Sequence, residues 1–138
     1  MKNIKIFKNI ICTIFFLNIL SAQDHWETAI FASDEWKYIV PDAEPSSNWN
    51  EINFNDDTWI SSQGGFGYAD GDDGTIIGPA ISVYFRKIFN VLDKNKLSCA
   101  ILSADYDDGY IAYLNGIEIS RSYNLPEPGT FVSFDETT

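Results

Sequence analysis

Beyond residue 25 the apolar residues fall into short runs that are rich in aromatic and β-branched side chains. Clusters of Gly, Pro, Asn and Asp separate these runs, a pattern typical of β-strands and not of helices. The runs are "TAIFA" (28–32), "WKYIV" (36–40), "SVYFRKIFNV" (82–91), "LSCAILSA" (97–104), "GYIAYLNGIEIS" (109–120) and "TFVSF" (130–134). The pattern predicts an all-β fold, an antiparallel β-sandwich.

The run at 82–91 alternates in the manner of a strand, in which successive side chains point to opposite faces. The odd-numbered face is expected to pack inward, with Lys87 as the exception that must reach solvent or an ion pair. The inward set is Val83, Phe85, Phe89 and Val91, and the opposite set is Tyr84, Arg86, Ile88 and Asn90.

The strongest local signal is a hairpin within 109–120. Two strand-like runs are joined by Asn115 and Gly116. This pair best tolerates the positive φ angles of a type I′ turn, so it predicts two antiparallel strands here.

The segment 49–79 is long, irregular and rich in Gly and Asp. A loop of this length inside a compact domain is usually functional or ordered by an ion. No internal repeat and no linker divides the chain, so one domain is expected.

The N-terminus has the three regions of a secretory signal peptide. Three lysines precede an apolar run at 10–20, and the small residues Ser21 and Ala22 follow it. That run is shorter than the roughly 20 residues of a membrane-spanning helix, so a retained anchor is the less favoured alternative. We expect a signal peptide at 1–22, a domain at 23–138, and a secreted or cell-surface protein with no membrane segment after cleavage.

The formal net charge is −11. The leader holds three of the nine basic residues and no acidic ones, so the exported domain would carry six basic and 20 acidic residues, a charge of −14. Such a surface repels phosphate backbones and argues against nucleic acid as a partner, whereas neutral glycans and cations remain compatible with it.

Of the two cysteines, Cys12 lies in the leader and Cys99 in the domain. An internal disulfide is therefore excluded in the exported chain. Cys99 stands in an apolar run with no histidine after it, so we interpret it as a small buried apolar residue and not as a nucleophile.

Four acids lie close together in sequence near the predicted hairpin. They are Asp105, Asp107, Asp108 and Glu118. Paired carboxylates can hydrolyse glycosides, but Asp and Gly at 107–109 are also typical of a turn for backbone reasons alone. The turn is the preferred interpretation, and the only histidine, His25, is expected to be structural or idle.

A second acidic cluster, "DGDDG" at 70–74, offers hard oxygen ligands on a flexible loop, as calcium prefers. Asp70, Asp72 and Asp73 are the candidate ligands. An EF-hand is excluded because Ile81 would stand at the twelfth loop position, where a bidentate Glu is needed. A calcium site of another kind and a solvated acidic loop both stay open.

Aromatic residues offer a further hypothesis, since sugar-binding modules stack pyranose faces on exposed rings. Most rings of so short a domain must form its core. Tyr68 and Tyr106 flank the acidic loops, so we take them, with Asp107 and Asp108, as candidate glycan-binding residues. The glycines of "GGFGY" (64–68) are expected to let the backbone pass close to neighbouring rings, and no phosphate-binding motif follows them.

Three segments together resemble a known family. They are "WNEINFNDDTW" (49–59), "VYFRKIFNV" (83–91) and "DDGYIAYLNGIEISRS" (107–122). Their types and order are similar to the galactose-binding-like jelly roll, as in the sugar-binding domain of glycoside hydrolase family 2. With "GGFGYADGDDGT" and "ADYDDGYIAYLNG" the chain also resembles N-terminal modules of secreted bacterial CotH-kinase and lamin-tail-domain proteins.

The resemblance covers roughly 26–124 and implies an eight- or nine-stranded sandwich that serves as an accessory module without chemistry of its own. It assigns structural roles to five residues, Phe54, Trp59, Arg86, Asn115 and Gly116.

The final strands of the family pattern are missing after 130–134, and an end there would leave an unpaired sheet edge. We therefore expect the N-terminal part of a longer protein whose downstream domain would be a partner of this module. Two alternatives remain: a fragment of an extracellular enzyme whose catalytic domain lies elsewhere, and a purely structural spacer.

Overall fold

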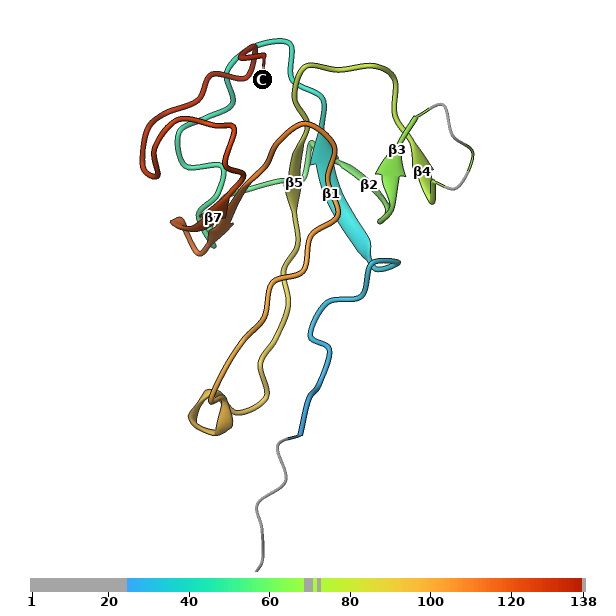
Figure 1. Ribbon diagram of the computed structural model, residues 1–138. Helices are drawn as coiled ribbons and strands as arrows, with labels where there is room; N and C mark the ends of the chain where they lie inside the picture. Colours follow the sequence, from blue (N-terminus) through green and yellow to red (C-terminus); the bar gives the residue numbers. More distant parts are fainter. Residues whose placement is uncertain (1–24, 69–70, 72, 138) are drawn as a thin grey trace, which may run out of the picture.

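The computed structural model describes residues 25–68, 71 and 73–137. Almost all of its regular structure is β-strand, which confirms the all-β class predicted from the sequence. The elements are β1 (Glu35–Ile39), β2 (Ile60–Gln63), β3 (Phe66–Gly67), β4 (Thr75–Ile76), β5 (Tyr84–Arg86), η1 (Lys94–Lys96), β6 (Ile111–Leu114) and β7 (Ile117–Arg121). Figure 1 shows β1, β2 and β5 at the centre, β3 and β4 on one side, and β7 on the other.

The central sheet has the order β2-β1-β5, and both pairings are antiparallel. β1 is the middle strand, since Lys37 lies opposite Ser61 on one side and opposite Arg86 on the other. Its sequence "EWKYI" has the β-branched and aromatic character that fits a half-buried strand. Two cations therefore lie directly opposite each other, Lys37 and Arg86, and nearby acids must compensate them.

β6 and β7 form the predicted hairpin. Asn115 has φ 51° and Gly116 has φ 82°, the two positive angles of a type I′ turn. The pairing shifts register between Ala112 and Tyr113, a β-bulge that increases the local twist. β3 and β4 instead form a two-residue parallel pair inside the long region 49–79.

Trp49 is the hub of the aromatic packing. It stacks on Trp59 at 6.3 Å and meets Tyr84 and Tyr113 edge-on at 4.8 and 5.6 Å between ring centroids. Among the described residues Trp59, at 7% exposure, is the one buried hydrophobic residue. The long loop thus links the central sheet to the β6–β7 hairpin through rings that lie far apart in sequence.

The predicted inward face of 82–91 is right only in part: Val83 and Phe89 are half-buried and Ile88 of the opposite set is exposed, but β5 itself departs from the prediction. Arg86 is the buried residue of β5 and Tyr84 is half-buried, while Phe85 is 36% exposed and Val91 is 47% exposed and lies beyond the strand. The reason is that the loop 49–57 covers the even-numbered face and supplies acceptors for the guanidinium. Phe85 still packs on other rings, at 4.6 Å from Phe66 and 6.5 Å from Tyr38.

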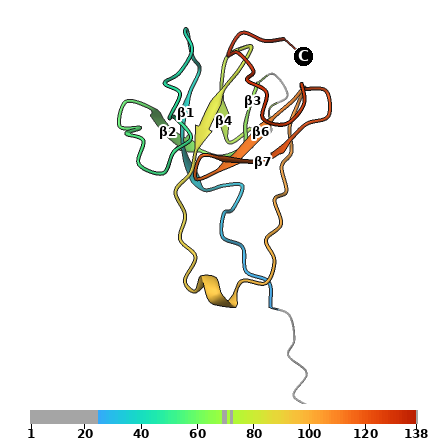
Figure 2. The ribbon, with the colours of Figure 1, turned by 90° about the vertical axis from the view of Figure 1, so that its left-hand side faces the viewer.

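Residues 88–106 form an excursion that we call the arm. Its two limbs run away from the body and join through η1, as both views show (Figures 1 and 2). Every residue from 90 to 106 is exposed. Cys99 is therefore exposed and not buried as predicted. Its apolar run is not a strand, because no backbone in the described part of the chain pairs with it, and the runs at 28–32 and 130–134 also lie outside the strands.

The predicted signal peptide at 1–22 lies outside the described residues. Within the part of the chain that is described, no helix has the length and apolar character to span a membrane.

Candidate functional site

Arg86 holds the long loop against the central sheet. Its Nε donates to Asp56 Oδ2 at 2.8 Å, and its Nη1 donates to the backbone oxygens of Trp49 and Glu51, the latter at 3.0 Å. The guanidinium also lies 5.1 Å from the centroid of the Phe54 ring. Because its donors reach the loop backbone, this buried cation is structural, in agreement with the role implied by the family resemblance.

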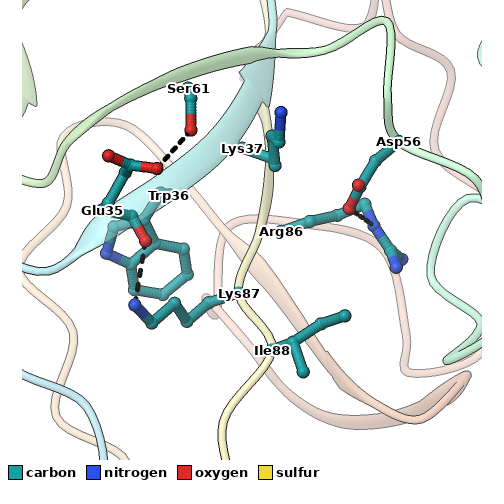
Figure 3. Close-up of a pocket in the computed structure, with 8 residues that line it drawn as sticks. All are labelled: Glu35, Trp36, Lys37, Asp56, Ser61, Arg86, Lys87 and Ile88. Carbon is teal, nitrogen blue, oxygen red and sulfur yellow. Dashed lines mark hydrogen bonds and ion pairs between the residues drawn. The ribbon is translucent and has the colours of Figure 1, made fainter.

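A groove of about 210 Å³ opens beside this cluster, between β1 and β5 (Figure 3). Trp36 lies there beside Glu35 and Lys87, and Ile88 supplies an apolar wall. The full lining is Glu35, Trp36, Lys37, Asp56, Ser61, Arg86, Lys87 and Ile88. An indole with several polar side chains around it suits binding of a small polar molecule.

The charges in the groove are engaged with one another. Lys87 Nζ donates to the Glu35 backbone oxygen at 2.9 Å and lies 3.5 Å from Asp34 Oδ2. The Glu35 carboxylate accepts a 2.7 Å hydrogen bond from Ser61 Oγ, and Lys37 Nζ lies 3.4 Å from the Trp59 oxygen. These contacts fix the walls of the groove.

Sequence reasoning missed this groove. A signal was present, since the strand sequences "EWKYI" and "FRK" place three cations among apolar residues. A cation in a half-buried strand requires an acid nearby, but which acids approach it depends on pairing distant in sequence.

The acids at 107 and 108 form a tight turn, as predicted. Gly109 N donates to the Asp107 oxygen at 2.8 Å, and Asp108 N donates to Asp107 Oδ1 at 3.1 Å. Asp108 has φ 61°, a left-handed conformation that Asp tolerates. Asn124 Nδ2 donates to the Asp108 oxygen at 2.7 Å and ties the turn to the segment after β7.

Tyr106 stands beside this turn with 45% of its surface exposed. Its ring lies 4.5 Å from the Tyr110 ring, centroid to centroid, and the Tyr110 hydroxyl forms a 2.8 Å hydrogen bond with Ser120 Oγ. The supporting ring is thus fixed to β7. We call Tyr106, Asp107, Asp108 and Tyr110 the tyrosine turn.

Tyr68, the other candidate ring, is 53% exposed. Among the described residues no ring contact joins it to Tyr106, so the structure does not unite the two tyrosines in one site.

Two of the three predicted calcium ligands, Asp70 and Asp72, lie outside the described residues. Asp73 is described and half-buried, and its carboxylate lies close against Gly67. Within the described part of the chain no three His, Cys, Asp or Glu residues form a metal-binding group. The calcium site stays a prediction.

Glu118 is committed to the hairpin. Its carboxylate accepts hydrogen bonds from Arg121 at 2.6 and 2.8 Å and from Gly129 N at 3.0 Å. The hydrogen bond from Arg121 lowers the pKa of Glu118, with a smaller contribution from Gly129 that acts in the same direction.

His25 lies on the exposed N-terminal segment, where its ring pairs with Glu27 at 3.1 Å.

Two tyrosines that contact the Trp49 ring, Tyr84 and Tyr113, have raised pKa values. Burial is the main cause for Tyr84, whose pKa rises to about 12, and the neighbouring Glu44 carboxylate adds to it. Burial also raises the pKa of Tyr113. Both hydroxyls are therefore protonated at neutral pH.

The glycine at 64 serves close packing, as the sequence suggested. A Cβ atom there would collide with the Ala32 backbone oxygen and lie 3.1 Å from Trp36 Nε1. Gly64 N donates to the Asp34 oxygen at 2.8 Å, which fixes the strand end beside the groove.

The fold and these sites define an all-β protein with a polar groove and an exposed tyrosine turn. Comparison with known proteins found no match: no family model, no curated protein and no solved structure is significantly similar to this chain.

Proposed function

We propose that this chain is a non-catalytic accessory module of a larger secreted or cell-surface protein, built as a galactose-binding-like β-sandwich, and that it binds a neutral glycan at the tyrosine turn. The observation that carries the proposal is the half-exposed Tyr106 ring, which rests on Tyr110 and directly precedes Asp107 and Asp108 in the chain. The strand-rich architecture and the β6–β7 hairpin are consistent with the sandwich.

Recognition would combine one apolar and several polar contacts. The carbon–hydrogen face of a pyranose stacks on Tyr106, while Asp107 and Asp108 accept hydrogen bonds from its hydroxyls. The Asn124 contact and the tight turn hold the Asp backbone in place before binding, which lowers the entropic cost. Exposed hydrogen bonds contribute only about 1 kcal/mol each, so affinity for a single sugar is in the range of about 1 mM.

A binding module explains the contacts of the acids better than an enzyme does. Glu118 is held by Arg121 and Gly129, and Asp56 by Arg86. These carboxylates stabilise the fold, whereas Asp107 and Asp108 of the tyrosine turn are exposed to solvent. Hydrolysis by the purified chain would contradict the proposal and favour the enzyme alternative.

The test is binding of the purified chain to a panel of neutral oligosaccharides, measured on a microarray and by NMR titration. Tyr106→Ala should weaken binding about tenfold, because the stacking surface is lost. Tyr123→Ala is the matched control, since Tyr123 is 96% exposed and lies outside the turn, and it should bind like the parent. Absence of binding to every glycan would favour the spacer, and binding unchanged in Tyr106→Ala would place the site elsewhere.

A further inference from the structure

The arm exposes an apolar strip that the body does not cover. Segment 97–104 holds no charged residue. Leu97 is 54% exposed, Ile101 72% and Leu102 53%, and in the other limb Leu92 is 97% exposed. Contiguous exposure of this kind on a small domain indicates an interaction surface.

The backbone of this limb is also unpaired. Among the described residues, 98–106 form no backbone–backbone hydrogen bond. The limb begins in extended conformation at Leu97 and runs away from the other limb in Figure 2. A row of free N–H and C=O groups is a template for an added β-strand, which identifies the occupant as extended polypeptide.

The charges at the two ends of 97–104 favour a second copy of this chain as that polypeptide. Lys94 and Lys96 precede the strip, and Asp105 and Asp107 follow it. When two copies pair antiparallel, the lysine end of each copy lies beside the aspartate end of the other. Parallel pairing would place like charges together.

A two-fold axis perpendicular to the paired strands relates the two copies, so each contact between them occurs twice.

We propose that residues 97–104 of two copies pair as antiparallel β-strands and join the chain into a homodimer through the arm. The paired residues 97–104 lie outside the tyrosine turn, and their pairing does not require glycan binding. It removes the apolar strip from water and provides partners for the unpaired backbone.

Sedimentation velocity of the purified full chain over a concentration series tests the dimer. The parent should dimerise reversibly, and Ile101→Lys should raise the dimer dissociation constant at least about tenfold, because a charge enters the apolar strip. Ile76→Lys is the matched control, since Ile76 is 76% exposed but lies in β4, and it should associate like the parent.

A proline pair tests whether the backbone mediates the contact. Cys99→Pro and Ala100→Pro each remove one N–H, and successive N–H groups of a strand point to opposite edges. Pairing along one edge predicts that one of these variants loses the dimer and that the other keeps it. Equal behaviour of the two variants would contradict strand pairing.

A charge swap tests the antiparallel orientation. Lys96→Glu alone and Asp105→Lys alone should each weaken association, and the double variant should restore it, because the opposed charges then attract again. A monomer at all concentrations would overturn the proposal. If the amides at 98–104 of that monomer resist hydrogen exchange, another segment of the same chain covers the strip.

Discussion

At the scale of single residues, Arg86 determines how the long loop meets the sheet. The Arg86 side chain is 8% exposed, and its guanidinium donates hydrogen bonds to Asp56 and to two backbone oxygens of the loop. Its carboxylate partner is 19% exposed, so the pair is largely removed from water. Removing one partner from such a pair leaves an uncompensated charge and orphaned acceptors.

We expect Arg86→Leu to lower the free energy of unfolding by about 3–5 kcal/mol, because Asp56 and the loop carbonyls lose their donor. Urea denaturation monitored by tryptophan fluorescence measures the change. Glu27→Gln, which removes the 73% exposed partner of His25, is the control and should change stability by less than about 0.5 kcal/mol. Equal effects of the two substitutions would show that burial of Arg86 is unimportant.

Tyr84 makes stability depend on alkaline pH. Its pKa is about 12 in the fold, against 10.0 for an unperturbed tyrosine, mainly because of burial. Between those values the unfolded chain releases the proton and the folded chain keeps it, so stability falls as pH rises from about 10 towards 12. Tyr84→Phe should flatten this part of the stability curve in thermal melts, and an unchanged slope would contradict the assignment.

At the scale of elements, the β6–β7 hairpin is the most self-sufficient part of the molecule. Its turn geometry, its bulge and the Arg121–Glu118 contacts all lie within residues 111–121. The turn also meets the long loop, since a Cβ on Gly116 would lie 2.7 Å from Glu51 Oε1.

Gly116→Ala should destabilise the protein by about 1 kcal/mol or more, because φ 82° strains an L-residue and the new methyl group crowds Glu51. Gly78→Ala is the matched control, since a Cβ there meets nothing within 4 Å, and it should change stability by no more than about 0.5 kcal/mol. Thermal denaturation of the two variants gives the comparison. A Gly78 effect as large as that of Gly116 would argue against strain at the turn.

At the scale of the whole molecule, few side chains are deeply buried and many apolar ones are exposed. Trp49 connects the loop, β5 and the hairpin, while the arm extends from them with its apolar strip uncovered. Such surface is unusual for an isolated domain and is the physical basis for the proposed dimer. The net charge of −11 opposes non-specific association, so contact is favoured at the charge-free strip.

The local features were predictable because their causes are local. Asn115 and Gly116 require positive φ angles wherever they occur in a two-residue hairpin, and Asp107 and Asp108 make a turn through their own backbone contacts. The candidate residues of the tyrosine turn were likewise found from their neighbours in sequence. Tyr68 was not joined to them, because its position depends on the long region that contains β3 and β4.

By itself the sequence determined the strand-rich class, the hairpin and its turn, and the acidic surface, since propensity, turn chemistry and charge act over a few residues. Only the tertiary structure decided that the Arg86 face of β5 is buried, that Cys99 is exposed, and that Glu35, Trp36 and Lys87 line one groove. Alternation alone cannot choose the buried face of a strand. The choice depends on which distant loop supplies hydrogen-bond partners, and a short-range pattern carries no information about that contact.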